Sequence, residues 1–469
     1  MIADLKPYAE YTESGLPWLG DIPQHWASER AKWLFTKMDR PVREDDEVVT
    51  CFRDGMVTLR KNRRLRGFTE ATVYSGYQGI CKGDLVIHGM DAFAGAIGVS
   101  DSDGKGTPVY NVCQPRPGVN ASYYAHLVRQ MSQSQWILAL AKGIRERSTD
   151  FRFEMFGNQR VPLPPPDEQA AIVRFLDWAN GRLERAIRAK RKVIALLNEQ
   201  KQAIIHRAVT RGLDPSVPLK PSGILWLGNI PQHWEVRPLK AVCEIQSGIT
   251  LGKDYVGQTT DEYPYLRVAN VQAGHANLAV VKTIRVTKAE ALRCTLQAGD
   301  VLMTEGGDPD KLGRGCVWNA QVAPCLHQNH VFAVRPNQSQ LEPHFLSAEM
   351  GTRYARAYFE STAKQTTNLA STNKTKIGQF QVLLPSVDEQ QRILTAITEE
   401  TGPVNTAISR LERETELLRE YRTRLVADVV TGKLDVREAA ARLPADAALD
   451  DSNNDPDLGP ELSDEAAEA

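Results

Sequence analysis

Long apolar runs are missing from this 469-residue sequence. No stretch approaches the ~20 consecutive apolar residues that a membrane-spanning helix needs, and the first thirty residues lack the basic segment followed by an apolar segment that marks a secretory signal. Closely spaced cysteine pairs are missing too, because the seven cysteines show no CxxC spacing. Their number is also odd. A chain of this length can build cores without disulfides. We therefore expect a cytoplasmic protein without a membrane span.

Net charge is nearly absent, but the charges are unevenly distributed. The sequence has 57 Lys and Arg residues against 58 Asp and Glu residues. Nine of the acids lie between Pro444 and Ala469, a stretch without Lys or Arg. Because this tail has little to bury, we expect residues 443–469 to be disordered. The remaining chain carries a net charge of about +8, which permits nucleic-acid binding without requiring it.

The sequence does contain an internal repeat. SGLPWLGDIPQHW at Ser14–Trp26 returns as SGILWLGNIPQHW at Ser222–Trp234, and PPPDEQAAI at Pro164–Ile172 returns as PSVDEQQRI at Pro385–Ile393. A third pair, VTRGLD and VTGKLD, follows each DEQ motif at the same distance. The chain is therefore a tandem of two halves, in which the segment after DEQ keeps its length and the segment before it varies.

The constant segments are typical of long helices, which we place at 167–213 and 388–442. Asp167 and Asp388 are candidates for capping the first N–H groups, and Gly402–Pro403 predicts a kink in the second helix. Apolar residues recur at three- and four-residue steps and form a seam that requires a partner helix. The seam residues that we expect to act as spacer and subunit-docking positions are Leu176, Leu183, Val193, Leu197, Ile204, Ile408, Leu411, Leu418 and Leu425.

Two equal helices in a tandem repeat can pair with each other. A helix of 44 residues is roughly 65 Å long, and antiparallel pairing across a pseudo-twofold axis would bury both seams. A dimerisation coil between two chains is the alternative. We favour the intrachain arrangement because the first helix is rich in Lys and Arg between Arg182 and Arg211, whereas the second carries glutamates between Glu412 and Glu420.

The variable segments, 1–166 and 214–387, are expected to be mixed α/β domains. Each contains a short apolar strand after a Gly-Asp turn, GDLVIHG and GDVLMTEGG. Each then contains a helix, which we place from His126 and from His344. The predicted fold is therefore α+β, with two α/β domains joined by two long antiparallel coiled-coil helices in a pseudo-twofold tandem repeat. A shared scaffold with divergent loops is typical of recognition modules.

The pattern resembles the specificity subunits of Type I restriction–modification systems. The resemblance rests on the paired WLG-x-IP-x-HW boxes, Trp18–Trp26 and Trp226–Trp234, on the paired P-x-x-x-EQ helix starts and on the tandem layout. EGGDPDKLGRGCVW at Glu305–Trp318 and HQNHVFAVRP at His327–Pro336 also resemble one class of that family's target recognition domains. The match extends from Ser14 to about Arg442.

The resemblance implies a non-catalytic, DNA-binding protein. Two target recognition domains would each read one half of a split double-stranded DNA sequence, and the long helices would set the gap. They would also dock two methyltransferase subunits, which bind S-adenosylmethionine and methylate adenine, and motor-nuclease subunits would join for restriction. The chain itself would bind no cofactor and no metal. The acidic extension after Leu443 departs from this pattern.

Candidate DNA contacts in the first half come from two basic segments. Arg and Lys bind phosphates and guanine, while Asn and Gln bind adenine edges. RKNRRLR contributes Arg60, Lys61, Arg63, Arg64 and Arg66, although such a run is also compatible with a solvated surface strand. The loop after the predicted helix contributes Arg145, Arg147 and Ser148.

Candidate DNA contacts in the second half come from two loops. The loop KQTTNLASTNKTK occupies the place in the repeat that the Arg145 loop occupies in the first half, so we expect both to face a groove. A glycine-flanked loop, DPDKLGRG, can approach a duplex closely. Together they contribute Lys311, Arg314, Lys364, Gln365, Thr366, Asn368, Asn373 and Lys374.

Catalytic alternatives find less support in the residues. The Asn/Asp-Pro-Pro-Tyr/Phe box of DNA adenine methyltransferases is missing, and Pro164–Pro166 instead end a strand. Asp308, Asp310 and Lys311 superficially match a metal-dependent nuclease, but GGDPDK is more typical of a turn. A self-contained methyltransferase or nuclease and a protein-only coiled-coil scaffold therefore stay as alternatives.

The opening box itself is expected to be structural. His25 and His233 occupy equivalent positions beside tryptophans, which argues against a role as metal ligands. We expect its four tryptophans to pack the entry of each domain against the long helices, at Trp18, Trp26, Trp226 and Trp234.

Overall fold

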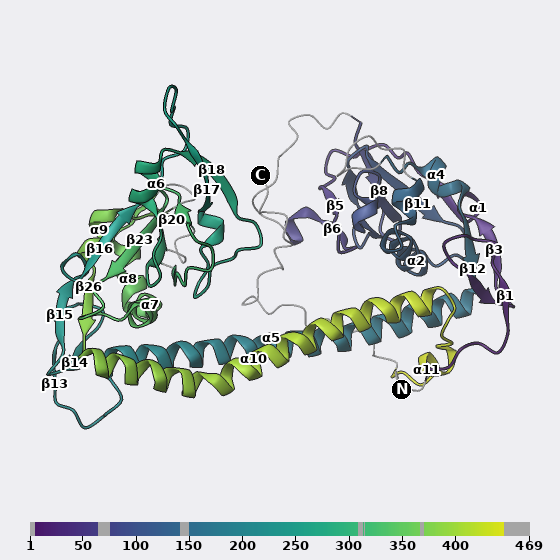
Figure 1. The fold of residues 1–469 in the computed structure, drawn as a ribbon. Helices are drawn as coiled ribbons and strands as arrows, with labels where there is room; N and C mark the ends of the chain where they lie inside the picture. Colours follow the sequence, from purple (N-terminus) through teal and green to yellow (C-terminus); the bar gives the residue numbers. More distant parts are fainter. Residues whose placement is uncertain are drawn as a thin grey trace. The chain divides into compact units, whose positions relative to one another are not determined.

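The computed structural model describes residues 5–63, 76–140, 150–307, 313, 315–365 and 370–444. The chain divides into two compact units (Figure 1). The first combines Met1–Ala189 with Glu414–Ala469, and the second is Lys190–Arg413. The boundaries cross the two long helices, so each unit contains one end of both. Of the predicted tail 443–469, residues 445–469 lie outside the described residues, whereas Leu443 is buried.

The first unit is a mixed α/β domain in which helix α2 covers one side of β8 and β9. Asn120 caps α2 by accepting hydrogen bonds from the N–H groups of Ser122 and Tyr123. The strands of the first unit are β1 (Tyr11–Glu13), β2 (Asp21–Pro23), β3 (Ala27–Arg30), β4 (Phe35–Lys37), β5 (Val49–Cys51), β6 (Val57–Leu59), β7 (Gln78–Ile80), β8 (Leu85–His88), β9 (Ile97–Val99), β10 (Gly104–Gly106), β11 (Tyr110–Pro115) and β12 (Arg160–Leu163). Its short helices are α1 (Ala31–Leu34), η2 (Arg60–Asn62), η3 (Ala92–Ala94), α2 (Ala121–Gln133), α3 (Trp136–Leu140), α4 (Phe153–Asn158) and α11 (Arg437–Ala441).

The second unit is also mixed α/β, with α7 lying against β19 and β21. Its strands are β13 (Leu219–Pro221), β14 (Asn229–Pro231), β15 (Glu235–Pro238), β16 (Cys243–Ser247), β17 (Asp261–Leu266), β18 (Lys282–Val286), β19 (Val301–Thr304), β20 (Gly306–Gly307), β21 (Gly315–Val317), β22 (Leu326–His327), β23 (Val331–Pro336), β24 (Lys364–Gln365), β25 (Ala370–Ser371) and β26 (Gln381–Leu384). Its short helices are η4 (Leu239–Ala241), η5 (Val268–Asn270), α6 (Lys288–Cys294), α7 (Pro343–Met350), α8 (Arg353–Thr362) and α9 (Lys374–Gln379).

The two units repeat the same strand pairings. The four-stranded antiparallel sheet β4-β11-β8-β9 of the first unit corresponds in chain order to β16-β23-β19-β21 of the second. The pairs β1-β2 and β3-β12 likewise correspond to β13-β14 and β15-β26. The remaining sheets differ, since the first unit adds β5-β6 and β7-β10 and the second adds β18-β17-β22 and β20-β25-β24. The sheets common to both units correspond to the repeat in the sequence. The sheets that differ distinguish one unit from the other.

The Gly-Asp turns precede the predicted strands β8 and β19. Gly83 and Gly299 both adopt a φ of 90°, which glycine tolerates without steric cost. The carboxylates that follow accept backbone N–H groups within their own turns, from Cys81 at 2.8 Å and from Gln297 at 2.7 Å. The helices that follow begin earlier than predicted. The first, α2, starts at Ala121 and not at His126 because Asn120 supplies the cap.

The long helices are α5 (Pro166–Arg211) and α10 (Val387–Val430). The expectation that aspartates cap them is wrong. Helix α5 already begins at Pro166, a residue type suited to the first helical position, and Ser386 caps α10 by accepting the N–H of Glu389 at 3.3 Å. Helix α10 continues through Pro403 and ends at Val430, so the predicted end at residue 442 is also wrong. Gly432, with a φ of 77°, ends it, and the separate helix α11 follows.

Opposite ends of α5 and α10 meet within each unit. In the first unit Leu176 and Leu183 share an apolar cluster with Leu425, and Arg422 Nη1 lies 2.9 Å from Glu184 Oε2. In the second unit Arg207 Nη2 lies 3.0 Å from Glu400 Oε2. Ile205 and Ile393 belong to one apolar cluster there.

Most of the predicted seam residues face a partner. Leu176, Leu183, Leu425 and Ile408 are buried, and four more are half-buried, at Leu197, Ile204, Leu411 and Leu418. The assignment of Val193 to the seam is wrong, because 44% of its surface is exposed. Ile194, seven residues after the buried Ile187, is half-buried in its place, as a 3.5-residue period requires.

Candidate nucleic-acid interface and its anchorage

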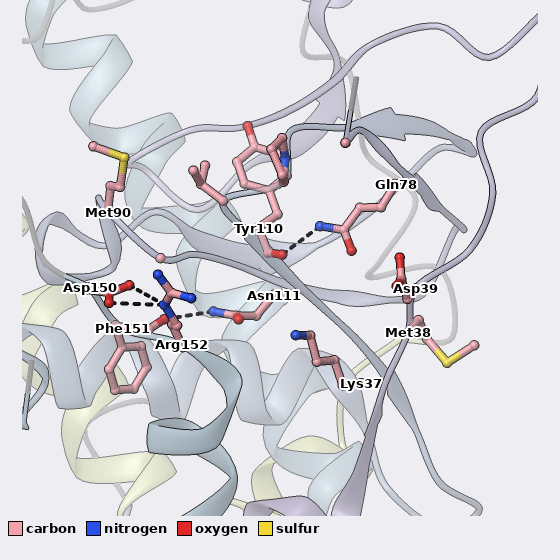
Figure 2. A pocket seen from close by; sticks show the side chains of 14 residues that line it. Lys37, Met38, Asp39, Gln78, Met90, Tyr110, Asn111, Asp150, Phe151 and Arg152 are labelled. Atoms are coloured by element: carbon pink, nitrogen blue, oxygen red, sulfur yellow. Dashed lines mark hydrogen bonds and ion pairs between the residues drawn. The ribbon is translucent and has the colours of Figure 1, made fainter. Parts of the chain in front are cut away.

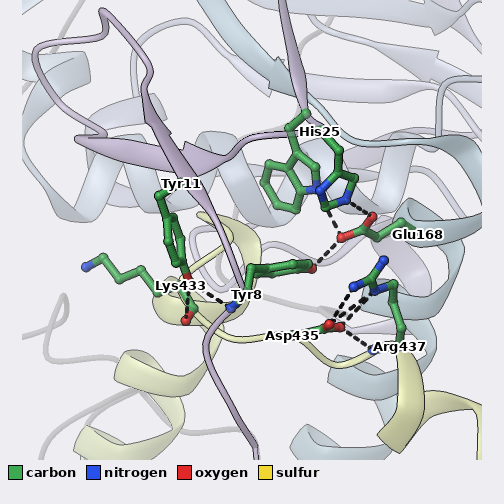
Figure 3. A network of polar contacts seen from close by, with 8 residues as sticks. Tyr8, Tyr11, His25, Glu168, Lys433, Asp435 and Arg437 are labelled. Carbon is green, nitrogen blue, oxygen red and sulfur yellow. Dashed lines mark hydrogen bonds and ion pairs between the residues drawn. The ribbon is translucent and has the colours of Figure 1, made fainter.

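The first copy of the tryptophan–histidine box binds the start of α5 through one carboxylate (Figure 3). Glu168 is buried, with 2% of its surface exposed. His25 Nε2 lies 2.8 Å from its Oε2, and Trp26 Nε1 donates a hydrogen bond of 3.0 Å to its Oε1. The Tyr8 hydroxyl donates a further hydrogen bond to the same oxygen. Burial and this hydrogen bond raise the pKa of Tyr8 well above its usual range, so the hydroxyl stays protonated and donating.

The second copy repeats this arrangement at the start of α10. His233 Nε2 lies 2.9 Å from Glu389 Oε2, and Trp234 Nε1 donates to Oε1 at 3.0 Å. Ser216 stands where the first half has Tyr8 relative to the box, and its hydroxyl donates to Asp214 instead. The glutamate of DEQ is therefore the residue that fixes each box to a helix, in agreement with a structural role for both histidines.

The glutamine of DEQ fixes a second loop. Gln169 Oε1 accepts the N–H of Asn120 at 2.8 Å, and its Nε2 donates to Pro164 O at 2.8 Å. Gln390 does the same, accepting the N–H of Glu342 at 2.8 Å and donating to Pro385 O at 2.9 Å. Both glutamines are fully buried. The residues that they hold immediately precede α2 and α7, so each helix start positions the main helix of its domain.

We call the contact of each box with the long helices a junction. At each junction, a glycine at the end of the other long helix also packs against the box. A Cβ on Gly432 would lie 2.4 Å from Pro23 Cδ and 3.0 Å from Trp26 Cη2. A Cβ on Gly212 would lie 3.4 Å from Trp234 Cζ2. The third repeated motif, VTRGLD and VTGKLD, therefore provides the close contact between a helix end and a tryptophan of the box.

The chain after α10 packs on the first box. The N–H of Asp435 donates to Lys6 O at 2.8 Å, and the Tyr11 hydroxyl donates to Lys433 O at 3.1 Å (Figure 3). Arg437 pairs with Asp435 and lies 5.2 Å from the centroid of the Tyr8 ring. Sequence reasoning missed these contacts because they join residues near opposite ends of the chain.

Two of the four tryptophans behave fully as predicted. Trp26 and Trp234 are buried, and Trp18 packs partly buried against the first core. Trp226 is wrong as a packing residue because 46% of its surface is exposed. Its place in the repeat predicts burial, but the described structure leaves it largely exposed.

Three of the basic candidates of the first half are described, and they contact their own domain. Lys61 Nζ lies 2.5 Å from Glu47 Oε2, and Arg60 Nε donates to Thr50 at 3.3 Å. Arg63 lies 2.5 Å from Asp54 and stacks 4.5 Å from the Phe52 ring centroid. Residues Arg60–Asn62 form a 3₁₀ turn rather than a surface strand. Arg64, Arg66, Arg145, Arg147 and Ser148 lie outside the described residues.

A cavity of about 330 Å³ lies in the first unit, and residues that come after the two candidate segments in the sequence line it. Gly76, ten residues after Arg66, and Asp150, two residues after Ser148, both line it. Figure 2 shows its polar wall, where Arg152 Nε donates to Asp150 at 2.8 Å and Asn111 Nδ2 donates to Phe151 O at 2.8 Å. Residues far apart in sequence therefore line one cavity.

A small sheet brings together the two candidate loops of the second half. Strand β25 pairs with β20 (Gly306↔Ser371) and with β24 (Lys364↔Ser371). The DPDKLGRG loop follows β20, and the Thr366 loop joins β24 to β25. Lys364 and Lys374 are exposed, and the backbone of Gln365 lies in β24. Asn373 instead caps α9 by accepting the N–H of Lys376 at 3.0 Å. Lys311, Arg314, Thr366 and Asn368 lie outside the described residues.

Sequence reasoning missed a basic cleft of about 830 Å³ in the second unit. Lys201 of α5, His344 of α7 and Arg356 of α8 line it, together with the backbone of Gly274 and Gly315. No carboxylate is among the described residues that line it. These residues come from three separate elements, so no single stretch of sequence shows the cluster.

Other kinds of site find no support in the described part of the chain. It contains no group of three or more His, Cys, Asp or Glu residues placed to hold a metal ion, and all seven cysteines are unpaired. Within the same ranges no helix is both long and apolar enough to cross a membrane.

Comparisons with known proteins agree on one family. The model of the Type I restriction modification DNA specificity domain matches residues 231–412. The chain is 22% identical over 358 residues to the EcoKI specificity subunit of Escherichia coli K12, covering 72% of this chain and 74% of the relative. It is 25% identical over 190 residues to a Methanocaldococcus jannaschii protein provisionally named as the type I restriction enzyme MjaX specificity subunit, covering 40% of this chain and 44% of that relative.

A solved structure shares the fold. It comes from work on complex assembly and conformational transition of the type I restriction–modification system, and it superimposes with a TM-score of 0.58 at 18% identity. The match covers 88% of this chain and 99% of that chain.

Proposed function

Because the chain belongs to the specificity subunits of Type I restriction–modification systems, we propose that each of its units reads one half of a split DNA target. The observation that carries this proposal is the convergence of the candidate segments. In the first unit Gly76 and Asp150, which follow the two candidate segments in the sequence, line one cavity, and in the second two loops follow strands of one three-stranded sheet. Basic and amide side chains on neighbouring loops can contact phosphates and base edges of one DNA segment.

The basic cleft of the second unit adds a site for the DNA backbone. Lys201, His344 and Arg356 offer hydrogen-bond donors to phosphate oxygens, and the glycine backbone permits close approach. Such contacts position a duplex without reading its sequence. The base-reading role therefore falls to the loops, and the cleft contributes affinity.

The long helices set the distance between the two half-sites. We assign α5 and α10 to one antiparallel coiled coil whose pseudo-twofold axis relates the halves, supported by the meeting of opposite helix ends in both units. A twofold arrangement offers two equivalent surfaces, which suits two methyltransferase subunits carrying S-adenosylmethionine. Motor-nuclease subunits would join this complex for restriction. The chain supplies specificity and leaves the chemistry to its partners.

The test is to express the chain with its methyltransferase partner and map methylated adenines across the genome. We expect methylation at a two-part sequence with a constant gap. A continuous target would contradict two-headed reading. Adenine methylation by the purified chain alone would show instead that the chain is itself an enzyme.

DNA binding by the purified chain tests the remaining alternative. Its affinity should fall steeply with salt, because each neutralised phosphate releases counterions. A chain that binds the methyltransferase but has no salt-dependent affinity for DNA would be a protein-only scaffold.

A further inference from the structure

The start of α5 carries a basic stripe, which we define as Arg174, Trp178, Arg182 and Arg185. Steps of four, four and three residues place these side chains on one face of the helix. The three arginines are exposed and Trp178 is half-buried. The guanidinium of Arg182 lies 5.3 Å from the centroid of the Trp178 ring. At 1.5 Å per residue the stripe is about 17 Å long.

Asp177 borders the stripe on the same helix. Its side chain is exposed, and its carboxylate offsets part of the positive charge of the stripe. The stripe therefore presents three positive charges and an aromatic ring beside one acid.

The described chain ends at this stripe. Arg174 Nη2 donates to the carbonyl oxygens of Leu443 at 2.9 Å and Pro444 at 3.1 Å. Leu443 itself is buried, which fixes the point of departure. The 25 residues that follow contain nine acids and no Lys or Arg. Extended, they can reach about 80 Å, several times the length of the stripe.

We propose that the acidic tail, residues 445–469, binds the basic stripe of α5 and shields it from other polyanions. Single exposed ion pairs contribute little, about 0.2–1 kcal/mol each. Covalent attachment at Pro444, however, holds the tail at a high effective concentration beside the stripe. Asp446, Asp450 and Asp451 come first along the tail and therefore need the shortest length of chain to reach the arginines.

Docking is tested with a fluorescent peptide of residues 445–469 and a full-length chain whose nine tail acids are replaced by Asn or Gln, the amide-tail chain. We expect the peptide to bind at low salt and to lose affinity about tenfold in the same chain with Arg174→Gln and Arg182→Gln. Lys282→Gln with Arg285→Gln on β18 is the matched control, because both residues are exposed cations outside the stripe. Equal binding to the stripe variant and the control would overturn the docking. So would binding of a peptide whose acids are replaced by amides.

Shielding is tested with double-stranded DNA that lacks the target sequence, and this part rests on the proposed function. The amide-tail chain should bind such DNA about tenfold more tightly than the natural chain at low salt. Because the replacements also raise the net charge, the comparison is repeated with Arg174→Gln and Arg182→Gln. In these stripe variants, the difference in DNA affinity between the amide-tail chain and the chain with the natural tail should shrink to the contribution of net charge alone.

The possible failures are distinguishable. A difference that is unchanged in the stripe variant would overturn the shielding. Peptide binding requires no DNA, so absence of DNA binding by both chains would contradict the proposed function and leave the docking to be decided by the peptide.

Discussion

Glu168 and Glu389 show how one carboxylate can join a recognition domain to a helix. Each accepts from a histidine and a tryptophan of its box, but their surroundings differ. The Glu168 side chain is 2% exposed and also accepts from Tyr8, whereas the Glu389 side chain is 18% exposed. Removing a buried charged acceptor costs folding free energy, because its hydrogen-bond donors are then left unpaired. The first junction should therefore depend more strongly on its glutamate.

We predict that Glu168→Gln lowers the free energy of unfolding by about 2 kcal/mol and that Glu389→Gln lowers it by about 1 kcal/mol. The amide keeps the size of the side chain but presents an N–H₂ group to donors. Urea unfolding followed by tryptophan fluorescence provides the measurement. Equal losses for the two variants would show that burial does not set the strength of the junction.

Glycine at the helix end gives a second prediction. Gly432→Ala should destabilise the chain by about 3 kcal/mol, from the cost of a positive φ and from overpacking against Pro23. Gly228 has a similar φ of 73°, but a Cβ there would meet nothing within 4 Å. Gly228→Ala should therefore cost about 1 kcal/mol. Unfolding midpoints that shift equally would refute the role of the close contact.

Glu349 of α7 gives a pH-dependent prediction. It is fully buried, accepts from the Tyr354 hydroxyl, and accepts the N–H of Leu383 at 2.7 Å. Its Oε2 has no hydrogen-bond partner among the described residues. Burial raises the pKa of this carboxyl from 4.5 to about 8, so the folded chain holds a proton that the unfolded chain releases.

A raised acid pKa contributes stability that is complete below pH 4.5 and is lost as pH rises through about 8. The natural chain should lose stability between pH 5 and pH 8.5 relative to Glu349→Gln, by a few kcal/mol. Urea unfolding at several pH values measures this difference. Glu244→Gln, at an exposed position of β16, should follow the natural chain, and a Glu349→Gln curve parallel to both would contradict the assignment.

At the scale of elements, the sequence predicted the repeated parts well. Repetition itself marks the boxes, the DEQ starts and the glycine ends, and apolar steps mark the two helices. The helix ends were harder to predict. Pro166 and Ser386 start the helices in place of the aspartates, and Gly432 ends α10 earlier than predicted. The seam misassignment at Val193 arose from counting steps of three and four where the neighbouring Ile194 fits the seven-residue repeat.

A matched pair of substitutions tests the seam. Leu425→Ala should lower the free energy of unfolding by about 3 kcal/mol, because this leucine is 3% exposed within the first core. Val193→Ala should change it by less than about 0.5 kcal/mol. Urea unfolding of both variants provides the measurement, and a large effect at Val193 would show that this residue belongs to the seam after all.

At the scale of the whole molecule, what sequence could not predict is which distant parts meet. The convergence at β20-β25-β24, the basic cleft and the contacts of Arg437 each combine residues separated by dozens to hundreds of positions. No local pattern encodes such pairing. The charge of the sequence therefore identified the candidate DNA-contacting segments. It did not reveal that Arg63 and Asn373 have structural partners.

The proposed ruler gives a prediction at this scale. In the proposed coiled coil, the register of the pairs Glu184–Arg422 and Arg207–Glu400 extrapolates to Ile187–Val193 opposite Glu414–Glu420, so both heptads are deleted together. The spacer should shorten by about 10 Å, which corresponds to roughly three base pairs at 3.4 Å each. Mapping methylated adenines should show a correspondingly shorter gap. An unchanged gap with retained methylation would show that the helices do not set the spacing.

The contacts around Lys6 and Asp435 also determine the order in which the halves can be completed. The second junction joins Gly212, Trp234 and Glu389, all of which precede residue 390. The first junction needs Tyr8 together with Asp435 and Arg437. Since a chain is synthesised from its N-terminus, the half that emerges first must wait for the last part of the polypeptide before it can close.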